Sequence, residues 1–172
     1  DLQPESAKTI ELGTKFENKN MKVSGSLFYR MGGNVIDWVK ELDSTRWESR
    51  NLTEVNVFGI DFSTEYRFQT PFIKKMALSY SFLTMDKNAG SYDSKYALDY
   101  LKNKLILSAD HNLYKSLDAS WKLSYVDRAG DYTDFKTAAK TNYEPYFMAD
   151  LRLQWSKINY DLYLDLNNIG NV

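Results

Sequence analysis

The chain has 172 residues, with 22 basic and 23 acidic side chains, one histidine and no cysteine. This near balance of charge argues against a nucleic-acid-binding protein, which needs a clustered basic face. The absence of cysteine excludes disulfides, thiolate catalysis and cysteine-based zinc sites, and a single histidine excludes multi-histidine metal sites. A carboxylate site for a hard cation such as Ca²⁺ stays open.

Apolar and polar residues alternate along most of the chain, which is the side-chain period of a β-strand. In chain order, the segments predicted to be strands are 9–18, 21–30, 58–68, 75–83, 104–113, 117–126, 147–155 and 160–167. In one of them, Trp121 and Leu123 share a face, while Lys122 and Asp118 lie on the other. No segment has the period of a helix, so the sequence predicts an all-β protein.

The predicted strands are about ten residues long, whereas strands of globular proteins average about five or six and tilted transmembrane strands need roughly 9 to 11. Their apolar faces carry no charged residue, as expected where a charge near the bilayer centre costs a few kcal/mol. The mean hydropathy of -0.53 is compatible with such strands, because only alternate residues are apolar. A soluble sandwich or lipocalin would show the same alternation with its apolar face inside.

Short and long connections between the predicted strands alternate. The short ones are 18–20, 69–71, 114–116 and 156–159, and the long ones are roughly 40–51, 86–102 and 128–143. This is typical of an outer-membrane barrel with short periplasmic turns and long extracellular loops. Aromatic residues also gather at both strand ends, as in interfacial girdles. Those near the short turns are Phe68, Phe72, Tyr114, Trp155 and Tyr160, and those on the far side are Tyr29, Trp38 and Tyr125. The connections therefore favour an antiparallel up-and-down transmembrane β-barrel, with Trp121 and Leu123 toward lipid and Lys122 and Asp118 toward a hydrated interior.

The predicted directions of the first and last strands place both chain ends on the extracellular side. A complete bacterial barrel is closed and has no free edge. We therefore expect an eight-stranded fragment of a larger barrel, whose unpaired edges and apolar face would self-associate or require detergent.

Several segments together resemble the TonB-dependent outer-membrane receptor family. LQPESAKTIELGTKFEN at 2–18 is similar to the family's "L-x-P-E … E-x-G" segment, and LFYRMGGNVIDWV at 27–39 is similar to its "FY…N-x-ID" strand. NLTEVNVFGIDFSTEYRF at 51–68 resembles the strand that follows, and YEPYFMADLRLQW at 143–155 and YLDLNNIGNV at 163–172 resemble the penultimate hairpin. The "PE-S", "N-x-ID" and "LKNK" stretches are most similar to the vitamin B12 (cobalamin) receptor subgroup.

The resemblance implies that residues 1–172 form about strands 14–21 of a 22-stranded barrel, with the N-terminal plug domain absent. It also implies a location in the outer membrane of a Gram-negative bacterium, in contact with outer-membrane lipid. The implied partners are the receptor's own plug domain, the TonB energy-coupling complex and a small-molecule ligand, either cobalamin or a ferric siderophore. Catalytic motifs are absent from the sequence, so no enzyme activity is expected. The alternatives are a passive outer-membrane porin or small structural barrel, and a soluble β-rich carbohydrate-binding module.

Candidate ligand-binding residues lie on the long loops, because binding residues concentrate on loops held by a rigid scaffold. They are Arg46, Trp47, Tyr92, Asp93, Tyr96, Asp99, Tyr100, Asp131, Tyr132, Asp134 and Phe135. Tyrosine offers rigid amphipathic contact area, and carboxylates can bind sugar hydroxyls, polar ligand edges or Ca²⁺. The alternative for each residue is an ordinary solvated loop position. No cofactor and no catalytic residue are expected, and His111 is interpreted as an interface residue.

Charged residues on the polar faces alternate in sign across neighbouring predicted strands. They are Asp61, Glu65, Arg67, Lys122, Asp150, Arg152, Asp161 and Asp165. We expect them to pair across the sheet and thereby to form a surface for a plug domain.

Overall fold

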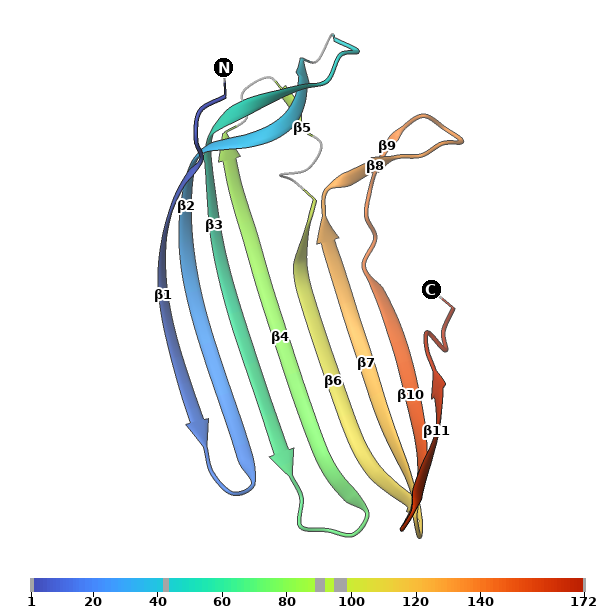
Figure 1. Cartoon of the computed structure of the whole chain (residues 1–172). Helices are drawn as coiled ribbons and strands as arrows, with labels where there is room; N and C mark the ends of the chain where they lie inside the picture. The colour runs from blue at the N-terminus through green and yellow to red at the C-terminus, as the bar shows by residue number, and fades with distance from the viewer. Residues whose placement is uncertain (1, 42–43, 89–91, 95–98, 172) are drawn as a thin grey trace.

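The computed structural model describes residues 2–41, 44–88, 92–94 and 99–171, in which eight antiparallel strands form one open, curved sheet (Figure 1). In sheet order these strands are β1 (Ser6–Glu17), β2 (Met21–Glu41), β3 (Glu48–Arg67), β4 (Ile73–Asn88), β6 (Tyr100–Tyr114), β7 (Leu117–Ala129), β10 (Tyr146–Lys157) and β11 (Tyr160–Leu166). The short β5 (Tyr92–Ser94) pairs with the end of β2, and β8 (Asp131–Thr133) and β9 (Lys140–Asn142) form a separate hairpin. The prediction of an all-β, up-and-down antiparallel fold is confirmed.

Within the described residues, no helix is long and apolar enough to cross a membrane.

The strand register keeps the apolar residues together on one face of the sheet. Leu27 pairs with Leu12 on one side and with Ile60 on the other. Ile60 pairs in turn with Phe82. Farther along, Trp121 pairs with Ala109 and Leu151. Because side chains at paired positions point to the same face, the alternation within each strand becomes a continuous apolar surface.

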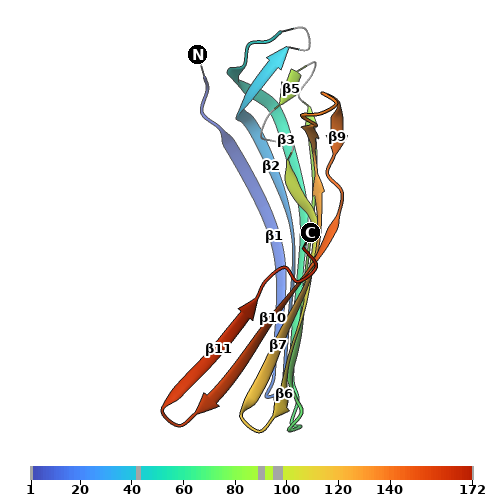
Figure 2. The same cartoon turned by 90° about the vertical axis from the view of Figure 1, so that its right-hand side faces the viewer.

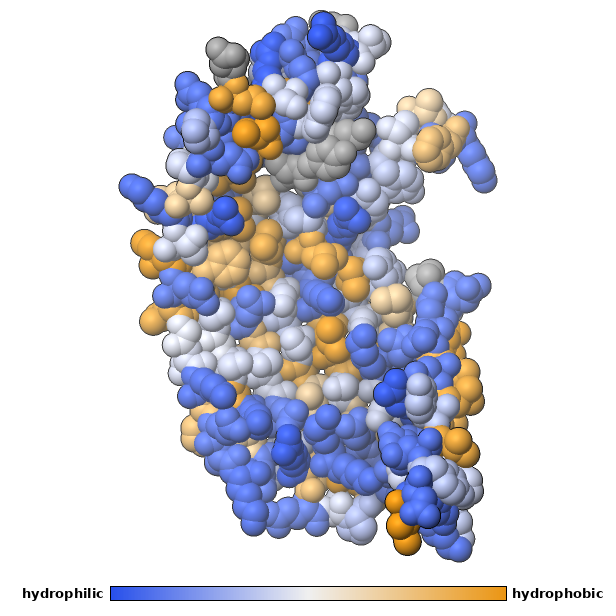
Figure 3. Space-filling model, viewed as in Figure 1, coloured by the Kyte–Doolittle hydropathy of each residue, from blue (hydrophilic) through white to orange (hydrophobic). Residues whose placement is uncertain are grey.

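The opposite face is concave and mainly hydrophilic. In Figure 2 the two end strands, β1 and β11, lie to the left of the middle strands, on the side that faces the viewer in Figure 1. Figure 3 shows this concave face. Ion pairs cross this face between neighbouring strands, and four of the residues predicted to pair across the sheet take part in them: Lys122, Asp150, Arg152 and Asp165. Their nitrogen–oxygen distances are 2.8 Å for Lys22–Glu17, 2.9 Å for Lys75–Asp110, 3.7 Å for Lys122–Asp150 and 2.6 Å for Arg152–Asp165. Asp61 accepts a 2.6 Å hydrogen bond from Ser81 of the neighbouring strand. The prediction of pairing across the sheet is wrong for Arg67 and Glu65, which form an ion pair within β3.

The short connections are tight turns set by local polar side chains. Asn18 Oδ1 accepts hydrogen bonds from the backbone N–H groups of Asn20 and Met21, at 2.9 and 2.8 Å. This is the turn geometry that an Asn side chain favours by mimicking a backbone carbonyl. At another turn, Lys115 has a φ of 48° and its carbonyl accepts a 2.9 Å hydrogen bond from Asn112. The predicted short connections are therefore correct.

The predicted long connections contain more strand than the sequence indicated. The pairing of β2 with β3 continues through Gly32 and Gly33 to Val39, because each glycine has a partner on β3. The strand predicted at 21–30 is thus shorter than β2, which ends at Glu41. The extension bends over the end of the sheet (Figure 1) and carries Trp38, which pairs with Ser49. Trp38 thus lies well beyond Tyr29 along β2 and is not part of one aromatic girdle with it.

Aromatic contacts do mark the end of the sheet with the short turns. The Trp155 and Tyr160 rings lie 5.9 Å apart between centroids, and the Tyr66 and Phe68 rings lie 4.7 Å apart. His111 lies at the same end, where its Nε2 accepts a 3.2 Å hydrogen bond from the Trp121 indole. These positions agree with the predicted short-turn girdle.

Candidate ligand-binding site

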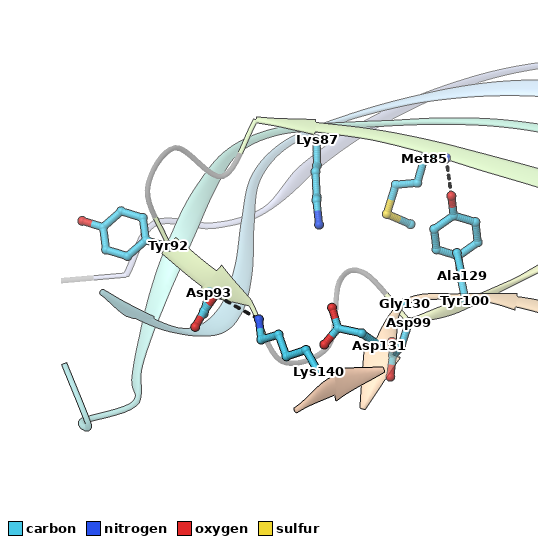
Figure 4. A pocket seen from close by; sticks show the side chains of 10 residues that line it. All are labelled: Met85, Lys87, Tyr92, Asp93, Asp99, Tyr100, Ala129, Gly130, Asp131 and Lys140. Carbon is cyan, nitrogen blue, oxygen red and sulfur yellow. Dashed lines mark hydrogen bonds and ion pairs between the residues drawn. The ribbon is translucent and has the colours of Figure 1, made fainter. Parts of the chain in front are cut away.

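The segments at the end of the sheet with the long connections surround a cavity of about 460 Å³ (Figure 4). Contributions come from β4, β5, β6, β9 and the junction between β7 and β8. The lining residues are Met85, Lys87, Tyr92, Asp93, Asp99, Tyr100, Ala129, Gly130, Asp131 and Lys140. Segments from two of the long connections, 86–102 and 128–143, thus meet at one place.

Tyr92 and Asp93 reach this cavity because β5 adds to the edge of β2. In the antiparallel register, Tyr92 pairs with Glu41 and Asp93 with Lys40. Backbone pairing restricts the directions of side chains on a strand more tightly than those of side chains on an irregular loop. The bent end of β2 therefore serves as the support for this wall of the cavity.

Asp93 ties three strands together through two lysines. Its carboxylate oxygens lie 3.5 Å from Lys40 Nζ on β2 and 3.4 Å from Lys140 Nζ on β9. Desolvation raises the pKa of Asp93, but the hydrogen bonds and charges of Lys140 and Lys40 together outweigh it and hold this pKa below the ordinary value. The ionised carboxylate is thus the form that the site favours.

The lowered pKa predicts that the contacts of Asp93 persist in mild acid. A carboxyl group whose pKa is lower in the folded state adds stability above its unfolded pKa and loses this contribution as the pH falls through the folded value. A carboxyl-detected NMR titration of the intact protein in detergent should place the Asp93 midpoint below the ordinary 3.8. Lys140→Met should move the midpoint upward, whereas an unshifted midpoint in the wild-type protein would contradict this assignment.

Tyr92 is held by Arg50 of β3. The Arg50 guanidinium donates a hydrogen bond to the Tyr92 hydroxyl, and its central carbon lies 5.0 Å from the centroid of the ring. Glu48 in turn forms a 2.6 Å ion pair with Arg50. A guanidinium over an aromatic face stabilises the position of the ring, so Tyr92 presents a fixed surface rather than a mobile one.

Asp99 organises the opposite side of the cavity. Its Oδ2 lies 3.6 Å from Arg128 and accepts a 3.3 Å hydrogen bond from the Tyr143 hydroxyl. The Arg128 guanidinium lies 4.8 Å from the Tyr143 ring centroid. Gly130 has a φ of 108°, and a Cβ added there would lie 1.7 Å from Asp99 Oδ1. Only glycine therefore allows the Asp99 carboxylate to lie against the backbone at this point.

Lys87 differs from the other charged residues of the cavity. Its side chain points into the cavity (Figure 4), and none of the described residues forms an ion pair with it. Desolvation lowers the pKa of Lys87, although the charges of Asp37 and Asp131 act in the opposite direction. Tyr100 lies nearby, where its hydroxyl accepts a 3.1 Å hydrogen bond from the backbone N–H of Met85.

The structure brings part of the predicted site together. Of the candidates, those that line the cavity are Tyr92, Asp93, Asp99, Tyr100 and Asp131. Tyr96 lies outside the described residues.

The other candidates lie away from the cavity. Tyr132 packs on Tyr143 with ring centroids 5.4 Å apart, and Phe135 is fully exposed in the turn of the β8–β9 hairpin. Asp134 shapes that turn, since its Oδ1 accepts a 2.7 Å hydrogen bond from the Lys136 backbone. Arg46 is exposed. The Trp47 ring lies beneath Lys40, whose Nζ is 5.6 Å from the ring centroid.

Sequence reasoning missed the basic residues of the site. Four basic residues that line or support the cavity lie within the predicted long connections but are not among the predicted candidates: Arg50, Lys87, Arg128 and Lys140. A usable signal was present, because each of these connections carries both acidic and basic residues. Among the residues that the structure describes, no three His, Cys, Asp or Glu side chains are grouped to hold a metal ion.

Comparisons with known proteins give a consistent picture. A family model described as "TonB dependent receptor-like, beta-barrel" matches residues 1–169. No curated protein matches the sequence.

Three solved structures are similar to the chain. The FrpB iron transporter from Neisseria meningitidis (F3-3 variant) is 17% identical with a TM-score of 0.70, over 99% of this chain and 28% of that one. The ferric-catecholate import receptor Fiu from E. coli K12 is 18% identical with a TM-score of 0.70, and the match covers 99% of this chain and 24% of that one. The copper transporter OprC is 10% identical with a TM-score of 0.73, and the match covers 99% of this chain and 26% of that one. At these identities the likeness shows the fold, and the chain spans about a quarter of the length of the structures it matches.

Proposed function

The chain belongs to the TonB-dependent receptor β-barrel family, and we propose that it forms part of the barrel wall of an outer-membrane receptor that takes up a scarce ligand by energy-coupled transport. The observation that carries this proposal is the family match over residues 1–169. The partners that the family implies are outer-membrane lipid on the apolar face, a plug domain against the concave face, and the TonB complex. The ligand would be carried unchanged.

The two faces of the sheet support this assignment. The outward face exposes large apolar side chains such as Leu12, Leu123 and Leu164, at 68%, 47% and 54% of their surface, as a lipid-facing wall would. The concave face has cross-strand ion pairs, which suit a hydrated interior. The cavity lies at the end with the long connections, which corresponds to the extracellular side in this class of barrel.

The proposed ligand is a ferric siderophore, with cobalamin as the second candidate. Solved structures with the same fold include an iron transporter and a ferric-catecholate receptor, as well as a copper transporter. The resemblance of short sequence stretches to the cobalamin receptors is the support for the second ligand. Tyrosine rings and charged groups in the cavity fit a bulky ligand with polar edges.

Uptake by cells that carry the intact receptor tests the proposal. Accumulation of a radiolabelled ferric tris-catecholate or of cyanocobalamin should be saturable and should stop when a protonophore removes the proton gradient. Uptake that persists without the gradient would support a passive porin instead. Recovery of the protein in the soluble fraction without detergent would support the soluble carbohydrate-binding alternative. Binding measured with and without Ca²⁺ tests whether the outer loops bind this cation.

A further inference from the structure

The apolar face of the sheet is hollowed where the neighbouring strands β6, β7 and β10 meet (Figure 1). The groove has a volume of about 410 Å³. The side chains of the apolar face that line it are Leu105, Leu107, Leu123, Tyr125, Phe147 and Ala149. Leu105 and Phe147 both pair with Tyr125, and one row lower Leu107 and Ala149 both pair with Leu123. The small Ala149 side chain leaves space between its larger neighbours, so the groove is a feature of packing on this face.

A polar network adjoins the end of the groove nearer the long connections. Tyr80 donates a 2.8 Å hydrogen bond to Asn103, and Asn103 donates a 2.8 Å hydrogen bond to Asp127. Asn103 and Asp127 are paired, and each lies two residues from a groove residue of its own strand, so the network is on the same face as the groove.

The hydrogen bonds of this network all run toward Asp127. In the part of the chain that the structure describes, no basic side chain forms an ion pair with Asp127. A carboxyl group has room for more hydrogen bonds than the single one from Asn103. The network therefore offers acceptor sites to a molecule that carries hydrogen-bond donors.

The order of network and groove along the strands matches the orientation of a lipid in the outer leaflet. β6 runs from the long connections to a short turn, so Asn103 lies nearer the extracellular side than Leu105 and Leu107. The Tyr125 and Phe147 rings, with centroids 4.9 Å apart, lie between the polar and the apolar parts. Aromatic residues gather at the headgroup level of a membrane. A molecule that fits both parts has donors at its outer end and an acyl chain at its inner end.

We propose that the groove binds an acyl chain of an outer-leaflet glycolipid, whose amide N–H or sugar hydroxyl groups donate hydrogen bonds to Asp127. The inference rests on the proposed function, which places the apolar face in the outer membrane, and it adds a lipid site separate from the ligand cavity. Asp127 and Tyr125 are two residues apart, which is roughly 7 Å along a strand. An acylated amino sugar suits this short separation, because its amide donor is attached directly to the acyl chain.

Native mass spectrometry of the intact receptor, freed of lipid in detergent and titrated with one lipid at a time, tests the inference. The main probes are lipid A, an acylated glucosamine disaccharide, and a phosphatidylcholine, whose headgroup has no hydrogen-bond donor. The receptor should bind lipid A more tightly. Asp127→Ala should weaken lipid A binding about tenfold, as expected for loss of a hydrogen bond to a carboxylate, and should leave phosphatidylcholine binding unchanged.

The groove has its own variant. Ala149→Phe fills it and should weaken lipid A binding about tenfold or more, because several methylene groups of the acyl chain lose their contacts. Ala109→Phe is the matched control, since Ala109 pairs with Trp121 on the same face but lies outside the groove lining. This control should bind lipid A as the wild-type protein does. Heat-dependent mobility in gels shows that each variant is folded.

Three results would each overturn the inference: wild-type affinity for lipid A in Ala149→Phe, equal binding of lipid A and phosphatidylethanolamine, or receptor dimers that Ala149→Phe abolishes. The last would show that a second copy of the chain occupies the groove. Energised uptake is measured separately in cells. Lipid A binding with the expected variant effects but without energised uptake would contradict the proposed function and support this inference. Normal uptake without those effects would contradict this inference alone.

Discussion

Leu27→Lys should strongly impair insertion and stability of the receptor in a bilayer, whereas Ser26→Lys, one residue away, should be tolerated. Leu27 lies on the apolar face between Leu12 and Ile60, with 46% of its surface exposed. A lysine near the bilayer centre of such a wall costs about 2–4 kcal/mol. This cost is a large part of the stability of most proteins.

Ser26 provides a matched control because it points to the other face. It pairs with Asp61 and lines a hollow of about 470 Å³ on the concave side, so a lysine there has both space and an opposite charge. Urea unfolding of each variant in lipid vesicles, followed by heat-dependent mobility in gels, measures the difference. Equal destabilisation by the two substitutions, or a larger effect at Ser26, would show that the two faces are assigned wrongly.

Gly130→Ala is expected to abolish most ligand binding while leaving the barrel wall intact. The added Cβ would lie 1.7 Å from Asp99 Oδ1 and 3.3 Å from the Asp99 Cα, so rotation of the carboxylate alone does not relieve the overlap. The φ of 108° adds backbone strain for any residue other than glycine. Asp99 would leave Arg128 and Tyr143, and this wall of the cavity would move.

The affinity of Gly130→Ala for the ferric tris-catecholate should fall by more than about tenfold, because displaced binding groups lose their preorganised geometry. Gly25→Ala is the matched control. A Cβ there has its nearest neighbours at 3.8 and 3.9 Å, which is ordinary contact, so binding and stability should be unchanged. Wild-type affinity in Gly130→Ala would show that ligand binding does not depend on the position of Asp99 against Gly130.

The sheet could be predicted because its signal is local. Each strand is marked by a period of two, and each short turn by residues such as Asn18 that form the turn with their own side chains. Arg152 and Asp165 were among the charged residues expected to pair across the sheet, and they face each other on neighbouring strands of a hairpin. The strand predicted at 21–30 was too short, because the pairing of residues 32–39 is a contact with a separate segment, β3.

The candidate site could be predicted only in part. Tyr92, Asp93, Asp99, Tyr100 and Asp131 were chosen for their chemistry on long connections, and they line one cavity. Phe135 and Arg46 were chosen on the same grounds but lie elsewhere, because residue type and loop position do not determine which loops meet. Lys87 and Lys140 also line the cavity but are not among the predicted residues, because only the spatial arrangement shows which charged residues of the long connections meet.

Side-chain alternation and contacts between chain neighbours were enough to predict the eight main strands, the two faces of the sheet and the order of its hairpins. Three features of the site required the folded chain to be known: β5 pairs with β2, Lys140 of β9 contacts Asp93, and Asp99 lies against Gly130. These contacts join segments that are far apart in the chain. Their geometry depends on how the sheet bends and on where each strand ends, and no periodicity within one segment encodes it.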